Sequence, residues 1–578
     1  MTSDWSSSAS AERAAWAANT SRLDHFKPLL PAEAEVVATL LTGQFDRLGD
    51  GLRPTHPDPS RIIRASFLRF LILGGEDGCR PHEKGVRISG AWITGVLDLE
   101  ACRVFRDIGL NDCHFEMPVV LRAAIINRLF LDRSRLPGLH AERLEARGGV
   151  YLRAAEVYGE VNLDQARLGG NLECDGAVIR NPGERALRAD SLEVRNVLLR
   201  GVDLTGAITL SGARLTADLD AAGATIRCPV GVALDSSEIE SRGNVVLRSA
   251  AIEGEVRIIA SLIGGDMDCS KVVVCNSGSS ALDLSRTTIK GAFFLRREAR
   301  LLGTLNLTGA AIGTIHDEAA CWPKSGDLLL NRCRYEAFID GPVDAATRLD
   351  WLARQSPERW GEDFWPQPYE QLADVFRAMG HWDDSRSVLI VKERLHRRAR
   401  RARARNPLWR SLLYLSDGIL GATLAYGRQP LLALLWLFCF WLVGVAVFGQ
   451  AEKEGAIMPN SAVVLRAPEW TLCGMEQSEQ RTMLASGQTS GLAGPGQNQL
   501  ACFRQRWEAS SYPAFSPWMY SLDTLLPVLD MGQRAFWRPN PTKQGGRMAM
   551  TYFYVQSVVG WALSLLAVAG FSGLVKSS

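Results

Sequence analysis

The chain has 578 residues, of which 47% are hydrophobic and 22% charged, and its formal net charge is +2. This composition excludes a disordered chain, and the length predicts roughly three or four domains. The near-neutral charge argues against a general affinity for nucleic acid, and 12 dispersed cysteines with no CxxC pair exclude a disulfide scaffold.

Residues 1–80 are predicted to form an N-terminal helical cap. The first residues contain no apolar signal-peptide core, so we expect no cleaved signal. The segment 59–75 places its large apolar residues on one side of a predicted helix: Ile62, Ile63, Phe67, Phe70 and Leu71. Such a helix would cover the first coil of the next domain, because an open solenoid end invites edge-to-edge pairing.

Residues 81–340 repeat a unit of eleven residues. Apolar and then small side chains recur at this interval: Val150, Val161 and Leu172, then Ala155, Ala166 and Ala177. Apolar residues two apart predict short strands, and a fixed short period without helical spacing predicts a β-solenoid. Two units make one coil of about 22 residues. Residues 86–338 therefore predict roughly eleven coils, stacked about 4.8 Å apart.

The segment ALDLSRTTIKGAFFL, Ala281–Leu295, has a small-x-Leu pattern that resembles the pentapeptide-repeat proteins. That resemblance implies a right-handed β-helix and no particular chemistry. Steps that alternate between five and six residues depart from the family's pattern and imply a wider coil. Inward-facing positions of the repeat include Cys102, Cys113, Cys174 and Cys269. We interpret these cysteines as small core residues; the alternative is metal ligation.

Residues 341–406 are predicted to be a helical hairpin linker with a basic end, its two helices separated at Gly380. The basic end has six arginines in nine residues: Arg397, Arg398, Arg400, Arg401, Arg403 and Arg405. Because an apolar segment follows, we interpret the cluster as a topology signal that contacts anionic lipid headgroups. The alternative is an arm that binds nucleic acid.

Residues 407–578 are predicted to be a membrane module. An amphipathic helix at the interface precedes two uncharged runs, 430–449 and 548–575, each long enough to cross a bilayer. The arginine cluster and Lys576 predict cytoplasmic N- and C-termini, with residues 450–547 forming an outer loop. These features indicate a multi-pass protein of the bacterial inner membrane, with the solenoid in the cytoplasm. In the outer loop, Cys473 and Cys502 are expected to form a disulfide; the alternative is two free thiols.

A short helix is predicted at residues 517–526, with Ser516 as its N-cap and Pro527 ending it. The order of membrane helix, half-helix, turn and second membrane helix resembles the pore module of two-pass potassium channels. The segment GWALSLLAVAGFSGLVK also resembles the inner helix of that family. A TVGYG-type filter is missing, and Asp530 and Gly532 stand in its place. The resemblance therefore implies no potassium selectivity.

Asp530 is the main pore candidate, because a carboxylate at membrane depth is costly unless it faces water or a partner. Asp523, inside the half-helix, is the weaker candidate, since it could simply favour the positive helix N-terminus. One alternative is that Arg534 neutralises Asp530 in a surface salt bridge. Another is that the half-helix lies on the outer surface without conduction.

The sequence contains no HExxH, GxSxG or GxGxxG motif and no phosphate loop, so we predict neither an enzyme nor a cofactor. The first hypothesis is an inner-membrane protein with an ion-channel-like module, a homo-oligomer and a tetramer if channel-like. Its β-helix would bind an unknown cytoplasmic protein or ligand, and no nucleic acid. The second is a non-conducting membrane-anchored scaffold. The third is a membrane-associated oxidoreductase, a label that bacterial chains of this layout sometimes carry.

Overall fold

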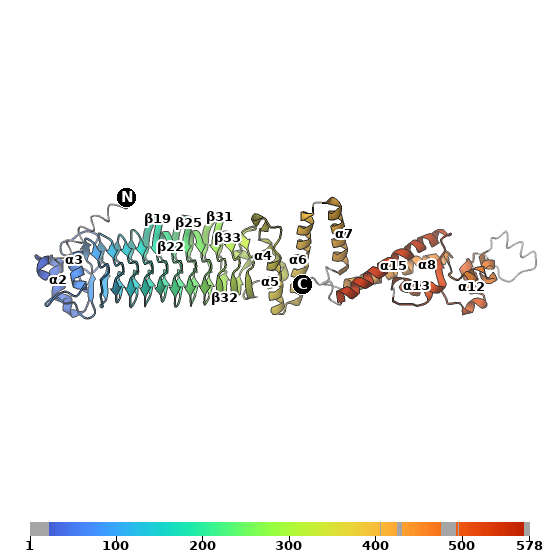
Figure 1. Ribbon diagram of the computed structural model, residues 1–578, viewed down its shortest axis with the longest axis horizontal. Helices are drawn as coiled ribbons and strands as arrows, with labels where there is room; N and C mark the ends of the chain where they lie inside the picture. Colours follow the sequence, from blue (N-terminus) through green and yellow to red (C-terminus); the bar gives the residue numbers. More distant parts are fainter. Residues whose placement is uncertain are drawn as a thin grey trace, which may run out of the picture. The chain divides into compact units, whose positions relative to one another are not determined.

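The computed structural model describes residues 22–404, 406–424, 431–474, 493–494, 496–526 and 528–571. The chain divides into two compact units, residues 1–392 and 393–578. Most of the first unit is a parallel β-solenoid of about 12 turns (Figure 1). This confirms the predicted solenoid, with about one coil more than the repeat predicted. Its right-handed sense stays a prediction.

Each regular coil contains four short strands, as in β10 (Leu129–Phe130), β11 (Arg135–Leu136), β12 (Leu139–His140) and β13 (Glu145–Ala146). Every strand pairs in parallel with the strand one coil further on. The registers for this coil are Leu129 with Val150, Arg135 with Glu156, Leu139 with Val161 and Glu145 with Arg167. The backbone hydrogen bonds therefore run from coil to coil along the solenoid.

The strands form two large parallel sheets, of 20 and 16 strands. Besides β10 and β13, the first contains β1 (Asp46–Arg47), β3 (Val86–Ser89), β6 (Ile108–Asn111), β9 (Ile125–Ile126), β14 (Val150–Tyr151), β17 (Arg167–Leu168), β18 (Leu172–Glu173), β20 (Glu193–Val194), β21 (Val197–Leu198), β23 (Arg214–Leu215), β24 (Leu219–Asp220), β26 (Glu240–Ser241), β27 (Val245–Val246), β29 (Leu262–Ile263), β30 (Met267–Asp268), β32 (Thr288–Leu295), β34 (Ala311–Asp317) and β36 (Arg334–Phe338). Besides β11 and β12, the second contains β2 (Ile62–Arg64), β4 (Trp92–Thr94), β5 (Leu97–Asp98), β7 (His114–Phe115), β8 (Val119–Val120), β15 (Glu156–Val157), β16 (Val161–Asn162), β19 (Val178–Arg188), β22 (Asp203–Thr209), β25 (Thr225–Asp235), β28 (Ala251–Arg257), β31 (Val273–Asp283), β33 (Arg300–Asn306) and β35 (Leu328–Leu329).

Three long strands, β19, β25 and β31, occur on alternate coils and project from one edge of the solenoid (Figure 1). Each carries an exposed loop that its own side chains close. In two of them an asparagine amide donates across the loop, from Asn181 to the Arg185 carbonyl (2.8 Å) and from Asn276 to the Ser280 carbonyl (2.6 Å). The coils in between have glycine opposite each loop. The structural repeat in this part of the solenoid is therefore a pair of coils.

Helices precede and follow the coils within the first unit. Before them are the 3-10 helices η1 (Leu23–Phe26) and η2 (Leu40–Thr42) and the helices α2 (Pro31–Thr39) and α3 (Ala65–Ile72). After them are η3 (Ala319–Cys321), α4 (Ala345–Ala353), η4 (Pro357–Trp360), α5 (Gln367–Ala378) and the start of α6 (Trp382–Arg403). Helix α4 is fixed to the last coils by a buried pair, in which Arg348 donates to both carboxylate oxygens of Asp317 (2.7 and 2.6 Å). The predicted helices after the solenoid are confirmed.

The second unit contains two helices that are long and apolar enough to cross a membrane, among the residues described: Leu431–Lys453 and Gln544–Ala569. They belong to α8 (Leu431–Lys453) and α15 (Gln544–Phe571) and include most of the two predicted spans. Helix α7 (Pro407–Leu424) precedes them and exposes large apolar side chains, including Leu408 and Tyr414.

The described parts of residues 450–547 form a small folded subdomain. It contains α9 (Ala462–Arg466), α10 (Pro468–Thr471), η5 (Leu472–Gly474), α12 (Gln499–Arg504), η6 (Glu508–Ser511), α13 (Pro517–Leu525) and α14 (Gln533–Phe536). Strands β37 (Ile457–Pro459) and β38 (Trp537–Pro539) pair in antiparallel register and join its two ends. Trp470, Phe503, Phe515 and Trp537 are buried together in its core. The segment predicted as an outer loop thus folds around a hydrophobic core, which also includes Phe448 of α8 and Ala549 of α15.

Candidate functional site

Helix α13 is the predicted half-helix, and it packs against both long apolar helices. Ser516 caps its N-terminus by accepting a hydrogen bond from the Met519 amide, and Pro517 occupies the first helical position. The helix ends at Leu525, one residue before the predicted end. Gly560 of α15 lies so close to the Leu525 carbonyl oxygen that a side chain there would collide with it.

Two polar residues tie α13 to the apolar helices. The Ser521 hydroxyl donates to the Trp441 carbonyl of α8 (2.9 Å), and the Gln556 amide of α15 donates to the Ser521 oxygen (2.9 Å). Both Ser521 and Gln556 are fully buried. Sequence reasoning missed this pair, although a glutamine within an uncharged membrane-length helix is the kind of signal that marks a buried polar contact.

Asp523 is fully buried beneath the turn that follows α13. Its carboxylate accepts hydrogen bonds from the backbone amides of Met531 (3.1 Å) and Arg534 (2.9 Å). The Arg534 guanidinium also pairs with it, with Nε 3.4 Å from Oδ1. Asp523 therefore connects the turn to the helix. The sequence alone suggested instead that its charge stabilises the helix N-terminus.

Asp530 lies in the exposed part of the same turn. Its Oδ1 accepts a hydrogen bond from the Gly532 amide (2.9 Å), and Gly532 has a positive φ of 74°, which favours glycine. The neighbouring side chains Val528, Leu529 and Met531 are exposed as well, Val528 by 89%. Within the described residues, the arginine predicted as an alternative partner of Asp530, Arg534, pairs with Asp523 instead.

The arginine cluster is divided between two environments. Arg397 and Arg401 on α6 donate to the two carboxylate oxygens of Asp417 on α7 (2.7 and 2.6 Å), a residue that is almost fully buried. Arg398, Arg400 and Arg403 are exposed, and Arg405 lies outside the described residues. Part of the cluster thus holds α6 and α7 together, and part is accessible from outside.

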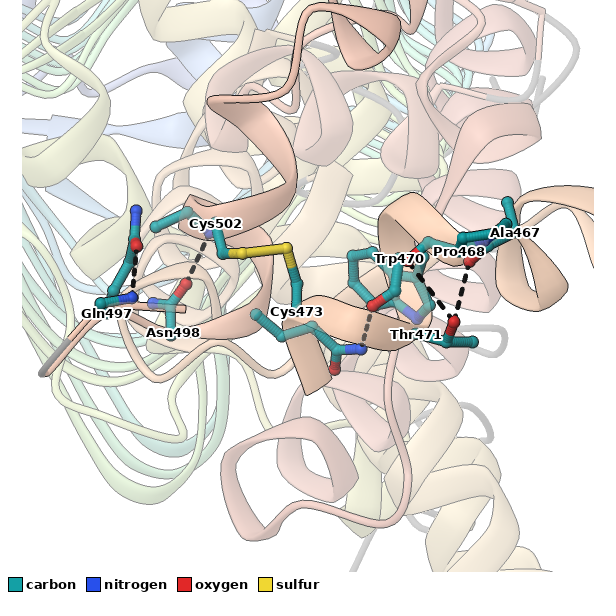
Figure 2. The surroundings of a disulfide bond; sticks show 11 residues. Ala467, Pro468, Trp470, Thr471, Cys473, Gln497, Asn498 and Cys502 are labelled. Atoms are coloured by element: carbon teal, nitrogen blue, oxygen red, sulfur yellow. Dashed lines mark hydrogen bonds between the residues drawn. A yellow bond between two sulfur atoms is a disulfide. The ribbon is translucent and has the colours of Figure 1, made fainter. Parts of the chain in front are cut away.

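Cys473 and Cys502 are joined by a disulfide between η5 and α12, with Cα atoms 5.7 Å apart (Figure 2). Asn498 caps α12 by accepting a hydrogen bond from the Ala501 amide (2.8 Å). The Gln499 amide donates to the Trp470 carbonyl (2.9 Å), which brings the two sides of the bridge together. Both cysteines are 4% exposed, in the subdomain core.

The four cysteines predicted at inward-facing positions of the repeat lie in four different coils. Cys113, Cys174 and Cys269 are buried free thiols, and Cys102 is half-buried. Burial raises the pKa of the Cys174 thiol to about 12, so it is protonated at neutral pH. No group of three or more His, Cys, Asp or Glu side chains that could hold a metal ion occurs in the part of the chain described.

Comparisons of this chain with protein-family models, with curated proteins and with solved structures find no match. The functional argument therefore rests on the geometry of the site alone.

Proposed function

We propose that the protein is anchored in a bacterial inner membrane by α8 and α15 and that its membrane module conducts cations as a homo-oligomer, a tetramer if its symmetry is channel-like. The observation that supports this proposal most is the place of α13. This short helix packs against both apolar helices and leads directly into the exposed turn that contains Asp530.

The physical basis is electrostatic. The C-terminal end of a helix carries a partial negative charge, and α13 ends at this turn. Asp530 adds a full charge, so several copies around one axis would form a ring of carboxylates that favours cations. The exposed apolar side chains beside it, Val528 and Met531, would contact neighbouring subunits or lipid.

Two finer features of the architecture belong to the same proposal. The solenoid is right-handed, and residues 22–80 close its first coil. The pairing of β1 with β3 and of β2 with β4 supports this closure, because the N-terminal segment then covers strand edges of that coil.

The orientation in the membrane is also part of the proposal. The exposed arginines Arg398 and Arg400 and the apolar side chains of α7 would rest on anionic lipid at the cytoplasmic surface. The solenoid and both termini would then lie in the cytoplasm, and residues 450–547 outside.

Cation flux into liposomes tests conduction. We expect the wild type to pass cations and Asp530→Asn to lower the preference for cations over anions by about tenfold, since one charge per subunit is lost at the constriction. The control is Glu508→Gln, which removes an exposed carboxylate of the same subdomain away from the turn. Its selectivity should equal that of the wild type. Conduction that is identical in wild type and Asp530→Asn would contradict the role of this residue.

A non-conducting membrane-anchored scaffold is the second candidate. It is favoured by the contacts within the turn, since Arg534 pairs with Asp523 and the Gly532 amide donates to the Asp530 carboxylate. Absence of flux from correctly folded wild-type protein at every applied voltage would support it over the channel.

A further inference from the structure

One face of the solenoid is hollowed into a groove of about 860 Å³. Its floor is formed by β13, β17, β20, β23 and β26, which stack in parallel in consecutive coils. Its charged lining consists of five arginines and three glutamates: Arg147, Arg167, Arg195, Arg214 and Arg242, with Glu145, Glu193 and Glu240. The formal charge of the groove is therefore +2, equal to that of the whole chain.

The first column of charges in the groove alternates in sign along the solenoid. Glu145, Arg167, Glu193, Arg214 and Glu240 occupy equivalent positions in five consecutive coils. Two ion pairs connect them, with N–O distances of 3.6 Å for Arg167 with Glu193 and 3.7 Å for Arg214 with Glu240. Most of the charge in this column is neutralised from within.

The second column lies two residues further along each coil and has charge on alternate coils only. Arg147, Arg195 and Arg242 are exposed, and the coils between them carry Gly169 and Thr216 in this column. Among the described residues, no carboxylate forms an ion pair with these three arginines. The small side chains between them leave the guanidinium groups accessible from the groove, and that of Arg147 also lies over the Phe105 ring, 5.9 Å from its centroid.

The distance between successive arginines in the second column determines how far apart a ligand must carry its acidic groups. Coils are stacked about 4.8 Å apart, so arginines on alternate coils are about 9.6 Å apart. A polypeptide in the polyproline II conformation has three residues per turn and advances about 3.1 Å per residue, so every third residue recurs on the same side after about 9.3 Å. Acidic residues at that interval would meet Arg147, Arg195 and Arg242 in succession.

We propose that this groove binds an acidic segment of a partner protein in the polyproline II conformation, with a carboxylate at every third residue and uncharged residues between. The planar guanidinium pairs with a carboxylate through two parallel hydrogen bonds. The segment would run along the solenoid, across its strands, so that side-chain contacts and not an added β-strand provide recognition. This proposal concerns the first unit alone and does not depend on conduction by the membrane module.

The glutamates of the first column disfavour a densely charged ligand. A strand of helical, stacked nucleic acid has one phosphate per about 3.4 Å of axis, or about three for each pair of coils. A pair of coils supplies two arginines and one glutamate, so the surplus phosphates would lie beside Glu145, Glu193 and Glu240 without a cation.

Fluorescence anisotropy with the full-length protein in detergent tests the proposal. The probe is a labelled peptide of repeated Glu-Ser-Thr triplets, and the competitors are a peptide of the same composition with its glutamates adjacent and a deoxythymidine oligomer. We expect the triplet peptide to bind about tenfold more tightly than either competitor. An oligomer that binds most tightly would overturn the proposal in favour of a nucleic-acid partner.

Two triple variants distinguish binding by the groove arginines from an effect of the protein's overall positive charge. Arg147→Gln, Arg195→Gln and Arg242→Gln together should weaken binding of the triplet peptide about tenfold. The matched control replaces three exposed arginines outside the groove, Arg143, Arg286 and Arg297, by glutamine and should change it less than about twofold. Unchanged binding by the groove variant, or an equal loss in the control, would overturn the proposal.

A third variant tests the role assigned to the glutamates. Glu145→Gln, Glu193→Gln and Glu240→Gln together should raise the affinity for the deoxythymidine oligomer by about tenfold, because surplus phosphates no longer face carboxylates. An oligomer affinity that does not change would contradict this role.

Discussion

Asp523 and Asp530 are close in the sequence, but they have different roles because one is buried and the other is exposed. Asp523 is fully buried and accepts two backbone hydrogen bonds and an arginine, whereas Asp530 is exposed and accepts one local hydrogen bond. A buried carboxylate with these partners organises structure, and an exposed one remains free to meet an ion.

Replacing each aspartate by alanine should therefore affect stability unequally. Asp523→Ala leaves the Met531 and Arg534 amides without their acceptor and the Arg534 guanidinium without its partner, so we expect a loss of about 3 kcal/mol. Asp530→Ala should change the free energy of unfolding by only about 0.5 kcal/mol. Thermal unfolding of the purified protein in detergent measures both. Equal melting temperatures would contradict the structural role of Asp523.

The position of this turn could be predicted from the sequence, but the side-chain contacts within it could not. Ser516 and Pro517 marked the start of α13, because capping depends on neighbours in the chain. The partner of Arg534 depends on how the turn folds back on the helix. Arg534 is closer in sequence to Asp530 than to Asp523, so sequence distance favoured the wrong aspartate.

At the scale of elements, the eleven-residue repeat was sufficient to predict the solenoid. Strands one coil apart must place apolar residues inward at equivalent positions, so Val150, Val161 and Leu172 recur in the sequence and are all fully buried. The pairing of coils was not predicted. The exposed loops at Asn181, Cys228 and Asn276 interrupt the repeat. In the sequence such a loop appears only as a short insertion between repeat units, which does not reveal that it recurs on alternate coils.

Glycine should be required opposite a loop wherever the backbone of that loop leaves no space for a Cβ atom. Gly206 has a φ of 127°, and a Cβ there would lie 2.7 Å from the Asn181 carbonyl oxygen. We expect Gly206→Ala to cost about 3 kcal/mol. The control is Gly176→Ala, which also has a positive φ, of 65°, but has open space around it. It should cost about 1 kcal/mol. Thermal unfolding that is the same for both variants would show that the loop contact is not limiting.

At the scale of the whole molecule, cysteine chemistry differs between parts of the chain. The ten other cysteines are free thiols and all lie outside residues 450–547, whereas the one disulfide lies within that range. Disulfides persist in oxidising compartments and are rare in the cytosol. This distribution is what a chain would need if residues 450–547 faced outward and the solenoid faced the cytoplasm.

The charges flanking α8 predict the same orientation. The short segment before it contains the arginine cluster, with Arg398 and Arg400 exposed. The segment after it also carries cations, but four of them, Arg534, Arg538, Lys543 and Arg547, lie near α15, and only Lys453 and Arg466 lie within 20 residues of the end of α8. Basic residues orient a membrane helix mainly when they lie in short loops or within about 15–20 residues of its end. The cluster ends 26 residues before Leu431, just outside this range, so it can hold the N-terminal side of α8 in the cytoplasm only if α7, as proposed, lies at the same membrane surface.

Reporter fusions test this orientation directly. A reporter that is active only outside the cytoplasm should score when inserted at Gly491 and should be silent at Ser578 and after Ala404. A reporter that is active only in the cytoplasm should give the reverse pattern at all three positions. Replacing Arg398 and Arg400 by glutamate tests the cause, since the weakened cluster should yield a mixed population at Gly491. Activity outside the cytoplasm for the wild-type Ala404 fusion would contradict the orientation, and with it the oxidising environment expected for Cys473 and Cys502.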